Sequence, residues 1–278
     1  MPNAIDHVAR FVLMRQGYRS EQVDTGSAVM RALVHDGEGD LPPLTVLHGW
    51  SSMGVHQGIV VRGLRRRVRR VVLPDLPGHG WSTCPSPLNG EEVTNAIHTA
   101  FPQWHPEPAV WMGSSFGGYV ALRYALMFPE HVRSLILVSP AGAPMTDDER
   151  HDFITLLRAR TEADVRRFLD RVSARPKRRN WLFAKEMRKV LRRRPLQDML
   201  DHQENFHPFT EAELDRVRVP VTLVWGRKES LWPRHHLAFW RKLPNVEVYE
   251  LEHSGHSPSI DQPFKFGAIV EEHLKRVT

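Results

Sequence analysis

The sequence contains little of what marks secreted or membrane-spanning proteins. Cys84 is its single cysteine, which excludes an intramolecular disulfide and is compatible with a reducing cytoplasm. The apolar runs are about as long as a strand, whereas a membrane-spanning helix needs roughly 20 apolar residues. Residues 7–18 hold only a short apolar run, which is broken by Arg10 and has no small-residue cleavage site. We therefore expect no signal peptide, no transmembrane segment and a cytoplasmic protein.

Clusters of metal-ligating residues and glycine loops that cradle phosphate are also missing, so we expect no metal ion and no cofactor. The composition is that of an ordinary globular protein, with 41% hydrophobic and 25% charged residues in a chain of 278. A chain of this length can bury a large core in one or two domains. Its net charge of +6 is unevenly distributed, because residues 150–195 contain 16 basic and 5 acidic residues.

Short, nearly continuous apolar segments recur along the chain and are typical of strands buried on both faces of a parallel sheet. We expect six such strands, at Leu44–His48, Arg70–Asp75, Ala109–Gly113, Ser134–Ser139, Val221–Gly226 and Val246–Glu252. Ser20–Asp24 and Ala28–His35 are separated by Thr-Gly-Ser and are expected to form an antiparallel hairpin entering the sheet. Helical patterns such as Tyr119–Phe128 and Phe264–Val277 complete an α/β fold, with a mostly parallel sheet flanked by helices.

The strand signal disappears between residues 144 and 215, where helical signals replace it. Thr146 and Glu149 have the spacing of a capping box, and apolar residues follow them at helical spacing. We interpret this stretch as a helical cap inserted after the sixth strand. The expected organisation is a core formed by residues 1–143 and 216–278, with the cap at 144–215.

A predicted sharp turn between a strand and a helix supplies the first candidate for catalysis. Ser115 has glycine two residues before it and two residues after it, at Gly113 and Gly117. Such a turn exposes a nucleophilic serine and crowds the backbone at both flanking positions, which therefore favour glycine. The same positions around Ser114 hold bulky side chains. We predict that Ser115 is the nucleophile, the alternative being a glycine-rich turn without a chemical role.

A serine that transfers acyl groups also needs an oxyanion hole, a base and an acid that orients the base. A His-Gly pair ends the strand Leu44–His48, where a loop could return to the serine, so the backbone N–H groups of Trp50 and Phe116 are the expected oxyanion hole. The expected base is His256, which follows a glycine in the loop after the last strand. His253 is its rival, but it adjoins the strand and has no glycine before it.

Glu229 is the candidate for the orienting acid. It is the first acidic residue after the strand Val221–Gly226, and it gives the chain order Ser, Glu, His. A glutamate can fix the imidazole tautomer as an aspartate does, but it needs room for about one more methylene. The alternative is a surface carboxylate beside Arg227 and Lys228.

Taken together, these segments resemble the α/β-hydrolase-fold family over almost the whole chain. The resemblance is carried by "LHGWSS", "PDLPGHGWS", "GSSFGGYVALRYALMFPEHVRSLILVSPAG", "VWGRKESLWP" and "HSGHSPSIDQPFKF". "LVSPAG" and the cap after it are similar to bacterial lipases and monoacylglycerol-lipase-like enzymes. The resemblance implies an α/β-hydrolase fold and a cap that shapes the acyl pocket, through residues such as Phe153, Leu156, Trp181 and Phe206. Family members usually carry aspartate at the position of Glu229.

The sequence therefore predicts a serine hydrolase that cleaves carboxylic esters through an acyl-serine intermediate. Its expected substrates are small-molecule esters with short- to medium-chain acyl groups, or monoacylglycerol-like lipids. Hydrolysis of carbon–carbon bonds, amides or lactones by the same three residues stays open, as does a non-catalytic ligand-binding protein of this fold. No nucleic-acid partner is expected, and the sequence leaves the oligomeric state open.

The basic stretch Arg175–Pro195 suggests a second kind of partner. It joins many arginines to Trp181, Leu182 and Phe183, as a helix at an anionic membrane surface does. The alternative is a solvated surface, since arginine is abundant throughout the chain. Weak association of the cap with anionic membranes is accordingly an expectation.

Overall fold

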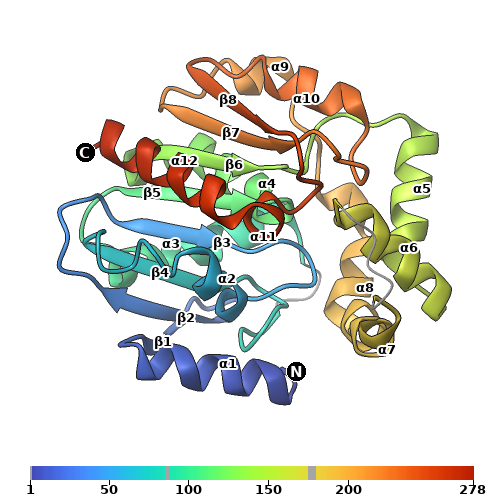
Figure 1. The fold of residues 1–278 in the computed structure, drawn as a ribbon, viewed down its shortest axis with the longest axis horizontal. Coiled ribbons are helices and arrows are strands. Elements are labelled where there is room, and N and C mark those ends of the chain that lie inside the picture. The colour runs from blue at the N-terminus through green and yellow to red at the C-terminus, as the bar shows by residue number, and fades with distance from the viewer. Residues whose placement is uncertain (1, 85–87, 175–179) are drawn as a thin grey trace.

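The computed structural model describes residues 2–84, 88–174 and 180–278, with the side chains of 180–183 left out. An eight-stranded sheet forms the centre of the fold (Figure 1). In spatial order its strands are β1 (Arg19–Asp24), β2 (Val29–Asp36), β4 (Arg70–Asp75), β3 (Leu44–Leu47), β5 (Ala109–Ser114), β6 (Val132–Val138), β7 (Val221–Gly226) and β8 (Val246–Leu251). The first two neighbouring pairs are antiparallel and the others are parallel. The predicted hairpin and six core strands are confirmed.

The carboxyl ends of the parallel strands meet at one edge of the sheet. Leu47 of β3 is paired with Gly113 of β5, Ser114 of β5 with Val138 of β6, and Val138 in turn with Val224 of β7. The loops that follow these strands therefore leave the sheet side by side. In open α/β sheets, ligands bind outside this edge.

Helices cover both faces of the sheet, because successive residues of a strand point to opposite faces. In β6, Leu135 and Leu137 pack in one apolar cluster, whereas Ile136 and Val138 pack in the other. The first face is covered by α3 (Gly90–Trp104), α4 (Phe116–Met127) and α10 (Arg234–Trp240). The second face carries α1 (Ala4–Arg15), α2 (Gly54–Val60) and α12 (Pro263–Arg276). The short helices η1 (Pro129–His131) and α11 (Pro258–Asp261) lie in connections.

Helix α1 is not indicated by the sequence pattern. A capping box between Asn3 and Asp6 begins it, and its buried side carries Asp6 and Leu13. Val8 and Phe11 point into solvent instead. The apolar residues of α1 therefore do not mark the side that packs on the protein, and this is why their spacing does not predict a core helix.

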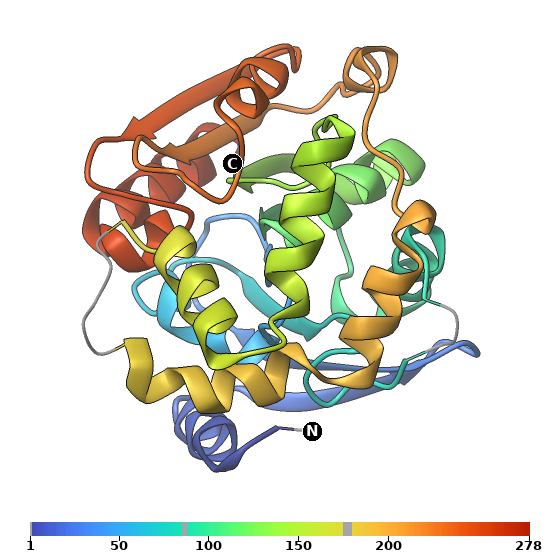
Figure 2. The same ribbon diagram turned by 90° about the vertical axis from the view of Figure 1, so that its right-hand side faces the viewer.

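Between β6 and β7 the described residues form five helices, and four of them gather at one end of the molecule (Figure 2). These four are α5 (Asp147–Arg158), α6 (Glu162–Val172), α7 (Asn180–Leu191) and α8 (Arg194–Asp201), with the turn η2 (Gln203–Asn205) after α8. The fifth, α9 (Glu211–Leu214), lies apart from them near α10 (Figure 1). The predicted capping box of Thr146 and Glu149 begins α5. The division into a core and a cap at 143/144 and 215/216 stays a prediction.

Candidate active site

Ser115 occupies the turn between β5 and α4. Its φ of 53° and ψ of −116° lie outside the regions that ordinary residues prefer, as expected of a serine lifted above a sheet edge. The backbone there is fixed, because Ser115 N–H donates to the Val138 carbonyl oxygen at 2.9 Å. The Ser115 carbonyl oxygen in turn accepts from the N–H groups of Gly118 and Ala141, at 2.9 and 3.0 Å. The side chain is therefore presented by a rigid turn.

The two flanking glycines are required by close backbone contacts. A Cβ added at Gly113 would overlap the carbonyl oxygen of Gly117. A Cβ added at Gly117 would overlap the carbonyl oxygens of Leu47 and His48, in the strand end next to the turn. The turn thus packs directly against the end of β3, which explains the Gly-x-Ser-x-Gly spacing around Ser115.

The loop after β3 passes beside Ser115. A Cβ placed on Gly49 would lie 3.5 Å from the Cβ of Ser115. Leu76 N–H donates to Nε2 of the buried His48 at 3.1 Å, so this imidazole carries its proton on Nδ1 and donates to the Gly49 carbonyl oxygen at 2.8 Å. Burial lowers the pKa of His48 well below its usual value, which keeps the ring neutral and these two bonds in place.

The two predicted oxyanion-hole N–H groups are available to a ligand. Trp50 and Phe116 both line the cavity that contains Ser115. Within the described part of the chain, neither backbone N–H donates a hydrogen bond to another protein group. Phe116 is also the first residue of α4, where the positive end of the helix dipole favours negative charge.

Glu229 and His256 form a buried hydrogen-bonded pair. Nδ1 of His256 lies 2.8 Å from Oε2 of Glu229, and their side chains are 7% and 3% exposed. The other carboxylate oxygen accepts from the N–H groups of Leu231 and Trp232, at 2.7 and 3.3 Å. Both oxygens of the glutamate are therefore occupied, and the extra methylene is accommodated by the loop after β7.

The environment keeps Glu229 ionised. Burial by itself would raise the pKa of this carboxyl. The charge and hydrogen bond of His256, with the N–H groups of Leu231 and Trp232, outweigh burial and hold the pKa below its usual value. An ionised Glu229 only accepts hydrogen bonds, so His256 carries its proton on Nδ1 and leaves Nε2 as the basic nitrogen.

Trp232 connects this pair to the turn of Ser115. Its indole packs edge-on against the His256 ring, with 5.6 Å between the ring centroids, and it lines the same cavity as Ser115. Its Nε1–H donates to the carbonyl oxygen of Ser139, the residue after β6, at 2.9 Å. Among the described residues, Ser115 and His256 make no hydrogen bond with each other. The structure thus brings Glu229 and His256 into direct contact and links them to Ser115 through Trp232.

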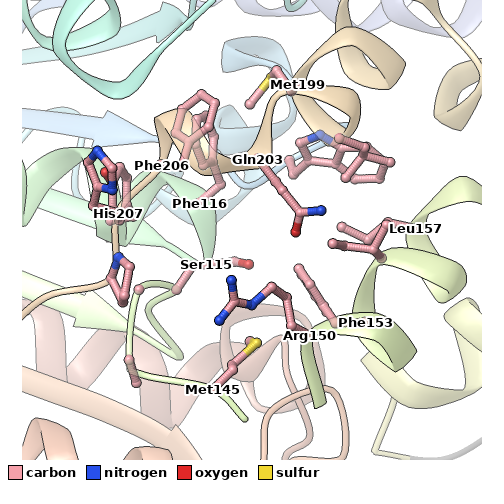
Figure 3. Close-up of a pocket in the computed structure, with 18 of the residues that line it drawn as sticks. Ser115, Phe116, Met145, Arg150, Phe153, Leu157, Met199, Gln203, Phe206 and His207 are labelled. Carbon is pink, nitrogen blue, oxygen red and sulfur yellow. The ribbon is translucent and has the colours of Figure 1, made fainter. Parts of the chain in front are cut away.

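A cavity of about 380 Å³ lies above Ser115, between the sheet edge and α5 and α8. Figure 3 shows the Ser115 oxygen pointing into it, with Arg150 and Gln203 directed toward the same space. Apolar side chains form most of its wall, including Phe153, Leu157, Met199 and Phe206. Of the four residues expected to shape the pocket, Phe153 and Phe206 line it and Leu156 packs in the core instead. The Trp181 side chain lies outside the described residues.

Sequence reasoning gave no role to the buried Asp75. Its carboxylate accepts from the N–H groups of Gly54 and Trp81, at 2.7 and 2.9 Å, and so joins the start of α2 to the loop after β4. Burial raises its pKa to about 6. The sequence feature that could have indicated this role is an acidic residue at the end of an apolar strand, directly before Leu-Pro-Gly.

His253, the alternative to His256 as the base, lies in an exposed turn after β8.

In the part of the chain that the structure describes, no three His, Cys, Asp or Glu side chains are grouped as ligands for a metal ion. None of the described helices has the length and apolarity to cross a bilayer.

Comparison with known proteins identifies the family. A model of the alpha/beta hydrolase family matches residues 46–268. The pimeloyl-[acyl-carrier protein] methyl ester esterase of Aeromonas hydrophila is 30% identical over 255 residues, covering 85% of this chain and 96% of that protein. Monoacylglycerol lipase ABHD6 of Bos taurus is 24% identical over 262 residues, covering 86% and 77%.

A solved structure has the same fold. Carboxylesterase CesB of Bacillus subtilis matches the fold with a TM-score of 0.80 at 21% identity, covering 97% of each chain. The predicted fold, a mostly parallel sheet flanked by helices, is confirmed. The named relatives support an esterase- or lipase-like function. The chain therefore belongs to the alpha/beta hydrolase family.

Proposed function

We propose that this protein hydrolyses carboxylic esters through an acyl-serine intermediate on Ser115. His256 acts as the general base, Glu229 orients it, and the N–H groups of Trp50 and Phe116 stabilise the oxyanion. The observation that carries the proposal is the buried His256–Glu229 pair, which contacts the wall of the cavity into which Ser115 points.

In the first half of the reaction, Ser115 Oγ attacks the ester carbonyl carbon while its proton passes to Nε2 of His256. The carbonyl electron pair moves onto oxygen, and the two backbone N–H groups stabilise that negative charge. When the tetrahedral intermediate collapses, His256 returns the proton to the departing alcohol. The hydrogen bond from Ser115 Oγ to Nε2 of His256 is expected to form as substrate enters, since catalytic hydrogen bonds are often long before substrate binds.

In the second half, His256 takes a proton from a water molecule as its oxygen attacks the acyl carbon, and the bond from that carbon to Ser115 Oγ then breaks. His256 returns the proton to Oγ, and the carboxylic acid leaves. Glu229 stays ionised throughout and stabilises the imidazolium that forms in each half. Its low pKa is consistent with this role, because a carboxyl that took up the proton itself would no longer hold His256 in the required tautomer.

The cavity supports a small or medium-sized substrate with an apolar acyl group. A volume of about 380 Å³ is near the lower end of the range for small-molecule sites, and its wall is largely apolar. The named relatives act on a pimeloyl methyl ester and on monoacylglycerol, both of which are carboxylic esters. We infer a short- to medium-chain acyl ester as the substrate class.

A substrate panel tests this function against its alternatives. We expect p-nitrophenyl esters to be hydrolysed with a maximum at short to medium chain length, and amides, lactones and carbon–carbon substrates such as dienone acids to react far more slowly. Preferential cleavage of one of those other classes would replace the ester assignment. A purified protein that turns over none of these substrates would favour a ligand-binding role.

Replacing Glu229 by glutamine is expected to lower kcat for ester hydrolysis by about 10³–10⁴-fold with little change in KM. The amide can still accept from Leu231 and Trp232, but its NH₂ group would face Nδ1 of His256. That arrangement moves the ring proton to Nε2, where it blocks removal of the serine proton. Steady-state kinetics with a p-nitrophenyl ester measures the effect.

Glu252→Gln is the matched control, because Glu252 is an exposed glutamate paired with Arg227 near the same loops. It should retain wild-type kinetics. Glu229→Asp keeps the charge but shortens the reach by one methylene, so it should lose less activity than Glu229→Gln. Full activity in Glu229→Gln would mean that another acid orients the base.

A further inference from the structure

The outer side of α1 carries an unusual concentration of exposed apolar side chains. Five large apolar residues of this helix are between 44% and 71% exposed, and one from α2 beside it is 82% exposed. We call this surface the α1 face; it consists of Ile5, Val8, Phe11, Val12, Met14 and Ile59. Isolated exposed apolar residues are normal, but a group of this size on adjacent helices marks an interaction surface.

Helix α1 is firmly attached on its opposite side, so this face is not a core surface that has turned outward. Asp6 contacts Nε2 of His56 at 3.0 Å. Leu13 packs so closely on α2 that a Cβ added at Gly58 would lie 2.6 Å from its side-chain carbons. In Figure 1, α1 runs along the lower edge of the molecule, below β1. The α1 face therefore remains available to an outside partner.

Positive charge adjoins the carboxyl end of α1. Arg15, in the last turn, is exposed, as are Arg62 and Arg66 in the turns after α2. Among the described residues these three make no ion pair. The turns after α2 pack near the end of α1, since their Val61 and Leu64 belong to the same apolar cluster as Leu13 and Tyr18.

The combination of exposed apolar and basic side chains fits one partner better than others. An interfacial helix places apolar side chains at the boundary between headgroups and acyl chains, while arginines attract anionic phosphates. Asp6 is the single acidic residue of α1, and it is buried, so no carboxylate of this helix opposes such contact. A second copy of the chain fits less well, because a two-fold contact through this face would bring the same arginines toward one another.

We propose that the α1 face docks on the surface of an anionic lipid bilayer, with Phe11, Val8 and Ile59 entering the headgroup region. This surface is distinct from the basic cap. Part of the basic stretch of the cap lies outside the described residues, namely residues 175–179 and the side chains of Trp181, Leu182 and Phe183. The proposal does not depend on the chemistry of Ser115. It assigns to the protein a membrane-contacting side formed by α1 and α2.

Sedimentation with vesicles tests this proposal. The wild-type protein should bind vesicles of phosphatidylcholine with 30% phosphatidylglycerol (a composition chosen for the assay) more strongly than pure phosphatidylcholine, and less strongly at high salt. Phe11→Glu should weaken binding to the anionic vesicles at least about tenfold, because it removes apolar area and adds a negative charge. Hydrolysis of a soluble ester should be unchanged in this variant.

The matched control is Phe264→Glu, since Phe264 is 92% exposed on α12, outside the α1 face. This control should bind vesicles as the wild type does, and Ser115→Ala should also bind, which separates docking from catalysis. Equal binding of Phe11→Glu and wild type would overturn the proposal. So would sedimentation velocity showing that Phe11→Glu only dissociates a dimer, with no vesicle binding by either protein.

Discussion

Alanine in place of Ser115 is expected to lower kcat/KM for ester hydrolysis by at least about 10⁴-fold while the fold stays intact. The variant has no oxygen to attack the carbonyl, so the acyl intermediate cannot form. Folding should be unaffected, because the turn is held by backbone bonds to Val138, Gly118 and Ala141 that alanine keeps. Activity with p-nitrophenyl butyrate and the thermal unfolding midpoint measure the two parts of this prediction.

Ser114→Ala is the closest control that the chain offers. Ser114 is the last residue of β5 and precedes the turn, so its substitution makes the same chemical change one residue away. We expect it to keep most of the wild-type activity. If Ser114→Ala were inactive and Ser115→Ala active, the assignment of the nucleophile would be wrong.

The second large effect is a loss of stability in mild acid. Among the described residues, burial lowers the pKa of five buried histidines far below 6.5: well below it for His48, to about 4 for His79, His236 and His273, and to about 3 for His105. The unfolded chain binds protons at these groups as the pH falls below 6.5, whereas the folded chain does not. The free energy of unfolding therefore falls between about pH 6.5 and pH 4.

The size of this effect follows from the number of groups. Each histidine contributes up to about 1.4 kcal/mol per pH unit within that window. Asp75 acts in the opposite direction, because its pKa of about 6 keeps its proton on the folded protein, and it offsets about one histidine. The remaining loss is comparable with the whole stability of a typical domain, about 5–15 kcal/mol. We expect unfolding before pH 4 is reached.

Urea unfolding at several pH values between 7.5 and 4.5 measures this dependence. His273→Gln should reduce the pH slope by about one proton, since His273 is buried between Thr222 and Ser134, which it contacts at 2.8 and 2.7 Å. His202→Gln is the control, because His202 is about half exposed at the end of α8, and it should leave the slope unchanged. A free energy of unfolding that stays constant from pH 7.5 to 4.5 would contradict the account of these buried rings.

The sequence predicts an element of this fold only where the apolar side chains of that element point into the core. The strands from β3 to β7 are buried on both faces and therefore read as continuous apolar runs. In α1 the buried side includes Asp6, while Phe11 and Val12 face solvent. A sequence pattern that requires apolar residues to face the core cannot detect such a helix. Which side of α1 packs on the protein is determined by tertiary contacts, and the local sequence does not record them.

In the candidate site, too, some features follow from the local sequence and others depend on tertiary contacts. The spacing around Ser115 followed from local crowding that the sequence expresses directly through its two glycines. The contact of His256 with Glu229 depends on β7 and β8 being neighbours in the sheet, and chain order alone does not determine that. The roles of His48 and Trp232 depend on hydrogen bonds to residues 28 and 93 positions away, which no local pattern records.

Labelling with a fluorophosphonate followed by peptide mass spectrometry examines the proposed chemistry most directly, because the probe reacts with an activated serine as an ester does. We expect one adduct, on the peptide that contains Ser115. It should form at the same rate as esterase activity is lost, and an ester substrate should slow its formation. An enzyme that is fully labelled on another residue, or that keeps hydrolysing esters after Ser115 is modified, would show that this serine is not where the acyl group is held.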